Sequence, residues 1–233
     1  LMVCHAGFWL SPFRIPDTFW LLLGHAGVEL FLVSTGFLLA RRAFASKRPE
    51  SIPRNWMRAL FRLWPLYAIL LAVNVVLSPA SNTEAVWIAY LGFAQNFAWP
   101  HPDLFGEAWI VAAAAMIMLV VPVVARALHG RRFSVGLLYL GSLLLAAHAL
   151  RGLLVWQGDP AFDLGVRKIL IARLDLPFYG LLLAWMWTHR YAALVPWRGA
   201  LAIAGLALLG LSTCAHLGVP LDTSMVARVY LLP

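Results

Sequence analysis

The stretch that decides the fold is GHAGVELFLVSTGFLLARR, residues 24–42. It is apolar enough to cross a bilayer, yet it holds an imidazole and an acid, His25 and Glu29, four residues apart and therefore on one face of a helix. An ionisable group at membrane depth costs free energy, so it usually faces a bundle interior or a watery cavity. Glu29 is the twelfth residue of a span that starts at Thr18, which places it near mid-depth. A structural partner such as Arg173 could neutralise the acid, but we expect a cavity there, with His25 as the hydrogen-bonding neighbour of Glu29.

The composition of the whole chain is that of a polytopic membrane protein. Of its 233 residues, 62% are hydrophobic and 12% are charged, whereas soluble domains average about 45–50% apolar and about 25% charged residues. A membrane-spanning helix needs about 20 mostly apolar residues. The sequence therefore predicts an all-α transmembrane helical bundle that forms a single domain over residues 1–233, incomplete at both termini. We expect partial first and last spans, and about six complete spans near 18–40, 58–78, 107–128, 133–156, 170–188 and 198–218.

The apolar segment 84–97 decides the topology, because at 14 residues it could be a short span or an interfacial helix. If it does not span, the basic loops fall on one side of the membrane and the acidic loops on the other, which favours this alternative. The positive-inside rule then places the basic loops in the cytoplasm. It also explains the net charge of +8 without any binding to nucleic acid. The residues that break the pattern are Arg14, Arg151, Arg167 and Lys168.

One helix enters the membrane from the cytoplasm with three arginines on one face. Arg54, Arg58 and Arg62 stand at spacings of four and form an arginine stripe. The stripe is either ordinary topogenic charge with snorkelling side chains or a clamp for phosphates, such as those of a nucleotide or coenzyme A.

The remaining polar residues give weaker signals. His5, alone in an apolar run, is by itself expected to be a hydrogen-bonded core residue, and Arg173 and Asp175 stand at the start of a helix as possible interface anchors. Two cysteines in apolar stretches, Cys4 and Cys214, suggest neither a disulfide framework nor a metal site. The chain has no phosphate-binding loop, nucleophile elbow or dinucleotide fingerprint. Residue-level reasoning therefore leaves an enzyme and a transporter both open.

Five segments resemble, in the right order, motifs of the acyltransferase-3 family of integral membrane acyltransferases. VCHAGFW resembles the end of the family's first helix, where a His follows an Arg by eleven residues. GVELFLVSTGFLL resembles G-V-D-L-F-F-V-L-S-G-F-L, and RLWPLY is similar to R-x-x-P-L-Y. AQNF resembles the Q-N-x segment, and ARLDLPFYGLLLAWMW resembles R-x-D-x-L-L-x-G-x-L-L-A. Apart from His5, the residues at the motif positions are Glu29, Tyr67, Asn96, Arg173, Asp175 and Gly180.

The resemblance implies transfer of an acyl group, typically acetyl, from acyl-CoA in the cytoplasm to a hydroxyl of an extracytoplasmic sugar, polysaccharide or lipid. His5 would be the general base, Glu29 would line the reaction cavity as a second catalytic residue, and the arginine stripe would hold the phosphates of the coenzyme. Acyl-CoA (acetyl-CoA) is then a donor substrate, with no permanently bound cofactor and no metal. The resemblance also implies a multi-pass protein in the bilayer of the bacterial inner membrane. Residues that would line or support the cavity are Tyr67, Asn96, Trp109, Arg173 and Asp175.

One segment departs from the family pattern. WIVAAAAMIMLVVP, residues 109–122, keeps the spacing of W-S-L-S-V-E-x-x-F-Y-x-x-x-P, but the position of the Glu is Ala114. Glu107 cannot simply substitute, because seven residues correspond to roughly 10 Å along a helix. A non-catalytic member of the fold therefore stands beside the enzyme as an alternative. The other is a polytopic transporter or flippase for an envelope precursor, although the chain has no internal repeat of the kind that transporters favour.

Overall fold

The computed structural model describes residues 17–46, 51–77, 84–98, 105, 108–158 and 166–218. His5 and the expected partial first and last spans lie outside these residues, as does the side chain of His25. The described part is helical and contains no strand, which confirms the predicted all-α class. Its elements are α2 (Asp17–Ala45), α3 (Ile52–Leu77), α4 (Glu84–Leu91), α5 (Ala108–Leu128), α6 (Phe133–Gly158), η5 (Ile171–Arg173), α7 (Asp175–Leu194), η6 (Val195–Trp197) and α8 (Arg198–Gly218).

The described helices include four regions long and apolar enough to cross a membrane, so the chain is an integral membrane protein as its composition predicts. The fourth region joins the two spans predicted near 170–188 and 198–218, because the short helix η6 links α7 to α8. The number of about six complete spans stays a prediction, since α2 is not among the four. The regions are Ile52–Leu77, Ala108–Leu128, Phe133–Gly158 and Ile171–Leu208.

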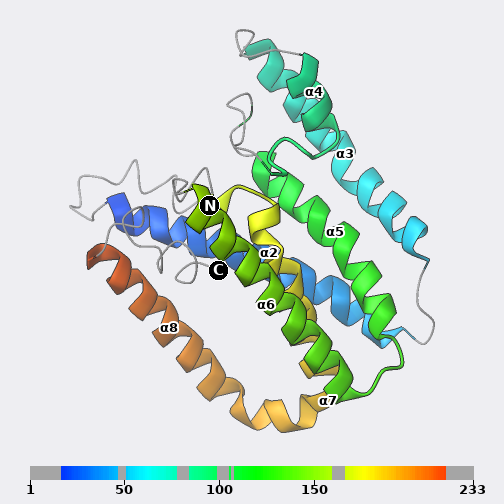
Figure 1. The fold of residues 1–233 in the computed structure, drawn as a ribbon, viewed down its shortest axis with the longest axis vertical. Coiled ribbons are helices and arrows are strands. Elements are labelled where there is room, and N and C mark those ends of the chain that lie inside the picture. Colours follow the sequence, from blue (N-terminus) through cyan, green and yellow to red (C-terminus); the bar gives the residue numbers. More distant parts are fainter. Residues whose placement is uncertain are drawn as a thin grey trace.

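The segment predicted not to span is indeed short. Helix α4 has 8 residues, or about 12 Å, which is well under the roughly 30 Å of a hydrocarbon core. It ends in a turn that includes Phe93, whose positive φ of 57° breaks the helix. Helices α3 and α5 consequently lie beside each other (Figure 1), and α6 and α7 continue the alternation of direction.

Arginines gather at one end of this bundle. At one end the C-terminal parts of α2 and α5 meet the N-terminal part of α3, and the side chains that line their junction include four arginines. The start of α6 lies at the same end, because the indole Nε1 of Trp185 on α7 donates to the carbonyl oxygen of Phe133 at 3.0 Å. The guanidinium of Arg190 lies 4.8 Å from the centre of the Phe133 ring. We call this the basic end; η5 and the turn after α4 lie at the other end.

Helices α2, α5 and α7 form the centre of the bundle, and small residues let them pack closely (Figure 1). Helices α2 and α7 run in the same direction and cross where Gly180 faces Gly36. A Cβ atom on Gly180 would come within 2.6 Å of the backbone nitrogen of Phe37. Helix α5 contributes four consecutive buried alanines, 112–115. Close contact through Gly and Ala is what holds helices together where lipid removes the hydrophobic drive.

Candidate functional site

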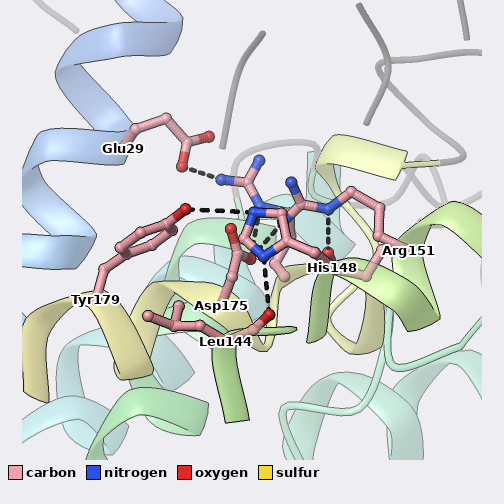
Figure 2. A network of polar contacts seen from close by, with 8 residues as sticks. Glu29, Leu144, His148, Arg151, Asp175 and Tyr179 are labelled. Carbon is pink, nitrogen blue, oxygen red and sulfur yellow. Dashed lines mark hydrogen bonds and ion pairs between the residues drawn. The ribbon is translucent and has the colours of Figure 1, made fainter. Parts of the chain in front are cut away.

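Four charged side chains meet in the bundle interior and form what we call the ionic network: Glu29, Arg151, Arg173 and Asp175 (Figure 2). Arg173 pairs with Glu29 through Nη2, and Arg151 pairs with Asp175 in the same way. The Nε atom of Arg173 lies 3.8 Å from Asp175 Oδ1 and links the two pairs. The four residues are between 0% and 8% exposed. The network holds two acids and two bases, so its formal charges cancel.

The network lies far from the basic end. Glu29 stands sixteen residues before the end of α2, or about 24 Å, and Arg151 stands eighteen residues after the start of α6, or about 27 Å. Arg173 belongs to η5, which is packed against α6 and leads directly into α7. The network therefore occupies the half of the bundle farther from the basic end.

The chain reaches this depth through a segment of irregular backbone, residues 166–174. Backbone polar groups in a bundle interior must be paired. The backbone nitrogen of Leu170 donates to the carbonyl oxygen of Asn96 at 2.9 Å, and the Asn96 side-chain nitrogen donates to the carbonyl oxygen of Lys168. Arg151 Nε donates to the carbonyl oxygen of Ala172 at 2.7 Å. The turn after α4 and the arginine on α6 thus hold the segment that presents Arg173.

A histidine and a tyrosine adjoin the network from α6 and α7. His148 Nδ1 lies 2.9 Å from the carbonyl oxygen of Leu144, and its Nε2 lies 3.2 Å from the hydroxyl of Tyr179. His148 is one helical turn from Arg151, and Tyr179 is one turn from Asp175. Figure 2 shows the two side chains beside the ion pairs. Both remain partly exposed, whereas the charged residues are buried.

A second polar site lies at the basic end. A cleft of about 130 Å³ opens between α2, α3 and α5, and we call it the basic cleft. Its polar lining consists of Arg42, Asn55, Arg58, Arg62, Arg126 and His129. None of the described residues that line it is acidic, and its apolar wall includes Met118 and Pro122. Two members of the arginine stripe, Arg58 and Arg62, are therefore brought together with arginines of α2 and α5, while Arg54 is exposed and does not line the cleft.

Comparison with known proteins identifies the family. The family model described as an acyltransferase domain, that of the acyltransferase-3 family, matches residues 1–231. The chain belongs to the acyltransferase-3 family. The match covers nearly the whole chain and confirms the resemblance seen in the motifs. No curated protein and no solved structure matches the chain.

Three of the family-motif residues lie together in the structure. Glu29, Arg173 and Asp175 come from two motifs about 140 residues apart and meet in the ionic network. The structure thus pairs Glu29 with Arg173, the partner that the sequence offered as an alternative to a cavity. Gly180, from the same motif as Asp175, is required by the close crossing of α2 and α7, because backbone of α2 occupies the space of its missing side chain.

The other family-motif residues support the site rather than carry charge. The Tyr67 hydroxyl donates to the carbonyl oxygen of Tyr90 at 3.0 Å, which joins α3 to α4. Asn96 holds the irregular segment, as described above. Trp109 on α5 lies under the guanidinium of Arg167, 4.7 Å from the ring centre. Ala114, at the position of the family's Glu, is 7% exposed and packs in the central apolar cluster.

Sequence reasoning missed three polar residues of the site: Arg151, His148 and Tyr179. Arg151 was visible as an exception to the charge pattern, and its burial explains the exception, because a paired arginine inside the bundle does not act as a loop charge. Arg167, another exception, is likewise buried, at 6% exposure. His148 stood three residues before Arg151 in an apolar span, which is the spacing of a shared helix face. Tyr179 had no signal beyond its place within a motif.

Proposed function

We propose that this protein is a membrane acyltransferase that moves an acetyl group from cytoplasmic acetyl-CoA to a hydroxyl of an extracytoplasmic sugar, polysaccharide or lipid. We further propose that it works in the bacterial inner membrane. Membership of the acyltransferase-3 family and the apolar helices support the class of reaction. The observation that carries the choice of donor is the basic cleft.

The basic cleft suits the phosphates of an acyl-CoA for a chemical reason. Arginine guanidiniums bind phosphate oxygens through paired, charge-assisted hydrogen bonds. Four arginines and one histidine line the cleft, and no acidic side chain among its described residues competes for them. The apolar wall provided by Leu39, Met118 and Val121 gives the uncharged part of a ligand a surface to contact. On the positive-inside rule the cleft opens toward the cytoplasm, where acyl-CoA is found.

The ionic network supports a reaction site nearer the acidic side of the bundle. Arg42 in the cleft and Glu29 in the network are thirteen residues apart on α2, which is about 20 Å. We assign Glu29 to the wall of the reaction cavity and His5 to the role of general base for the hydroxyl of the acceptor. In the transfer itself, the acceptor hydroxyl would give its proton to His5 and attack the thioester carbonyl of the donor, and coenzyme A would leave as the thiol. The donor must therefore extend its acyl end across this distance.

Ala114 favours a second candidate, a non-catalytic member of the family. The position that carries an acid in the family motif is an alanine within an apolar cluster. A protein of this kind would keep the cleft, the network and the fold, and would bind acyl-CoA without transferring the acyl group.

Binding of acetyl-CoA to the purified protein tests the proposal. Arg62→Gln removes one guanidinium from the cleft, and a hydrogen bond to a charged group contributes about 1.5–3 kcal/mol, so affinity should fall by roughly 10- to 150-fold. Arg198→Gln is the matched control, because Arg198 is an exposed arginine that does not line the cleft. Equal affinity of the two variants would refute the cleft as the donor site. Transfer of labelled acetyl groups in proteoliposomes then separates the enzyme from the non-catalytic candidate, which binds but does not transfer.

A further inference from the structure

Glu29 carries a buried oxygen that lacks a donor within the described residues. Its Oε2 atom accepts from Arg173, whereas its Oε1 atom is buried and has no hydrogen-bond partner. The residue as a whole is 8% exposed. A buried carboxylate oxygen without a donor has lost its hydration and gained no hydrogen bond in return, which is unfavourable. Such an atom therefore calls for an explanation. A bound group that donates a hydrogen bond would supply one.

The hydrogen-bond polarity of the neighbouring pair is fixed by the backbone. A carbonyl oxygen can only accept, so the His148 Nδ1 that faces the carbonyl oxygen of Leu144 carries the proton. In the neutral ring Nε2 is then an acceptor, and the Tyr179 hydroxyl must donate to it. The Tyr179 proton is thereby committed to His148. Toward any other group, the Tyr179 oxygen can therefore only accept a hydrogen bond.

The two acceptor oxygens belong to side chains that lie close together around the ionic network. Glu29 pairs with Arg173, Arg173 lies beside Asp175, and Tyr179 follows Asp175 by one turn of α7. In Figure 2 the Tyr179 hydroxyl points toward His148 while the Glu29 carboxylate extends toward the same group of side chains from α2. Tyr179 and His148 are only partly buried, whereas Glu29 Oε1 is buried, so a ligand would reach this group of side chains first at Tyr179.

We propose that Glu29 Oε1 and the Tyr179 hydroxyl oxygen form a subsite that accepts hydrogen bonds from two hydroxyl groups of the acceptor, with His148 fixing the direction of the Tyr179 bond. The ligand class is a polyhydroxy compound, because the subsite presents two acceptors. This inference rests on the proposed function, from which it takes the identity of the ligand as the acyl acceptor. Tyr179 and Glu29 are binding residues here, and His148 is a positioning residue.

A purely structural role for the pair makes a different prediction. A His148–Tyr179 bond that only ties α6 to α7 would affect stability and would be indifferent to the chemistry of the acceptor. A purely structural role would also leave the buried Glu29 Oε1 atom without a hydrogen-bond donor among the described residues. The proposed subsite instead distinguishes a hydroxyl, which donates, from a methoxy group, which does not. Discrimination between these two groups is therefore the decisive quantity.

The test uses methyl glucopyranoside and its four mono-O-methyl ethers as acceptors, with labelled acetyl-CoA and the full chain in proteoliposomes. In the parental protein two positions besides the acylated one should discriminate hydroxyl from methoxy in kcat/KM, one by about 5-fold for Tyr179 and one by about 10-fold or more for the Glu29 carboxylate. Tyr179→Phe should abolish the first discrimination and retain the second. It should not change the KM for acetyl-CoA. Tyr139→Phe, the same change at an exposed site on α6, should retain both.

His148→Leu provides a second variant that keeps the Tyr179 hydroxyl. Without an acceptor at position 148 the Tyr179 proton is free to turn toward a methoxy oxygen, so the Tyr179-dependent discrimination should fall to within about 2-fold. Retention of both discriminations in Tyr179→Phe and His148→Leu would overturn the subsite while leaving the transfer reaction in place. If the parental protein transfers acetyl groups from acetyl-CoA to none of the glucosides, the proposed function is overturned and this inference with it.

Discussion

Neutralising Asp175 should destabilise the protein more than any change of a surface charge. Asp175 is 0% exposed and contacts both Arg151 and Arg173. Asp175→Asn keeps the shape of the side chain but changes the formal charge of the ionic network from zero to +1. Removing one partner of a buried ion pair costs about 3–5 kcal/mol, because the remaining charge is left without compensation in a medium of low dielectric.

The expected loss can be expressed as a shift in the thermal midpoint. For a chain of 150–250 residues, 1 kcal/mol corresponds to about 2–4 °C. Asp175→Asn should therefore lower the midpoint by roughly 6–20 °C in detergent micelles, as followed by circular dichroism. Arg198→Gln, which removes an exposed charge, should change it by less than about 2 °C.

A double variant separates the effect of charge from that of packing. Arg151→Met with Asp175→Leu removes both members of one pair and returns the formal charge of the network to zero. Apolar replacement of a buried pair is often neutral or stabilising, but this variant also removes the Arg151 Nε donor of the Ala172 carbonyl oxygen, so it should regain part of the loss in midpoint. If Asp175→Asn and Arg198→Gln have the same midpoint, Asp175 is not a buried partner of Arg151 and the network is wrong. If the double variant is less stable than Asp175→Asn, the charge argument fails even though the contact stands.

Three further predictions follow from the packing, the topology and the family motif. Gly180→Ala should prevent the close crossing of α2 and α7 and lower the yield of folded protein, whereas Gly141→Ala, whose new Cβ meets nothing within 4 Å, should fold normally; equal yields would refute the crossing. In a cysteine-free background, a cysteine at Arg131 should react only with reagents in the cytoplasm and one at Phe97 only with reagents outside, and the reverse pattern would invert the topology. Ala114→Glu, which restores the acid of the family, should raise acetyl transfer per folded molecule while lowering the thermal midpoint, and loss of an already normal activity would show that the motif is misaligned or the cavity rebuilt.

Much of the fold could be predicted because the bilayer permits few solutions. An apolar run of about 20 residues must be helical if its backbone groups are to be paired, which is why 107–128 and 133–156 correspond closely to α5 and α6. The segment 84–97 was assigned from charge rather than from hydropathy, and the short α4 agrees with that assignment. The boundary between 170–188 and 198–218 was less predictable. The backbone is non-helical at Arg190, but helical structure resumes directly after this bend.

The site was predictable only where two motifs supplied opposite charges. Glu29 in an apolar span required a cation, and Arg173 was available in another motif, so their pairing followed from charge alone. Arg151 could not be placed in the same way, because its partner Asp175 could equally have been an interface anchor. Its assignment needs the depth at which η5 enters the bundle. That depth depends on the backbone hydrogen bonds from Leu170 to Asn96 and from Ile171 to Phe97, which no side-chain pattern encodes.

The arginines of this chain act in two ways, and the distribution of acids separates them. Arg151 and Arg173 are buried and have carboxylates within the bundle, so the network needs no external anion. The arginines of the basic cleft lie among described lining residues that include no acidic side chain, which is why we propose that the phosphates of acyl-CoA bind there. At the network, Glu29 Oε1 is a buried oxygen without a donor among the described residues, and the Tyr179 oxygen can accept a further hydrogen bond. Under the proposed function, a phosphate ligand would bind at one end of the bundle and a hydroxyl ligand at the other, as acyl transfer across a membrane requires.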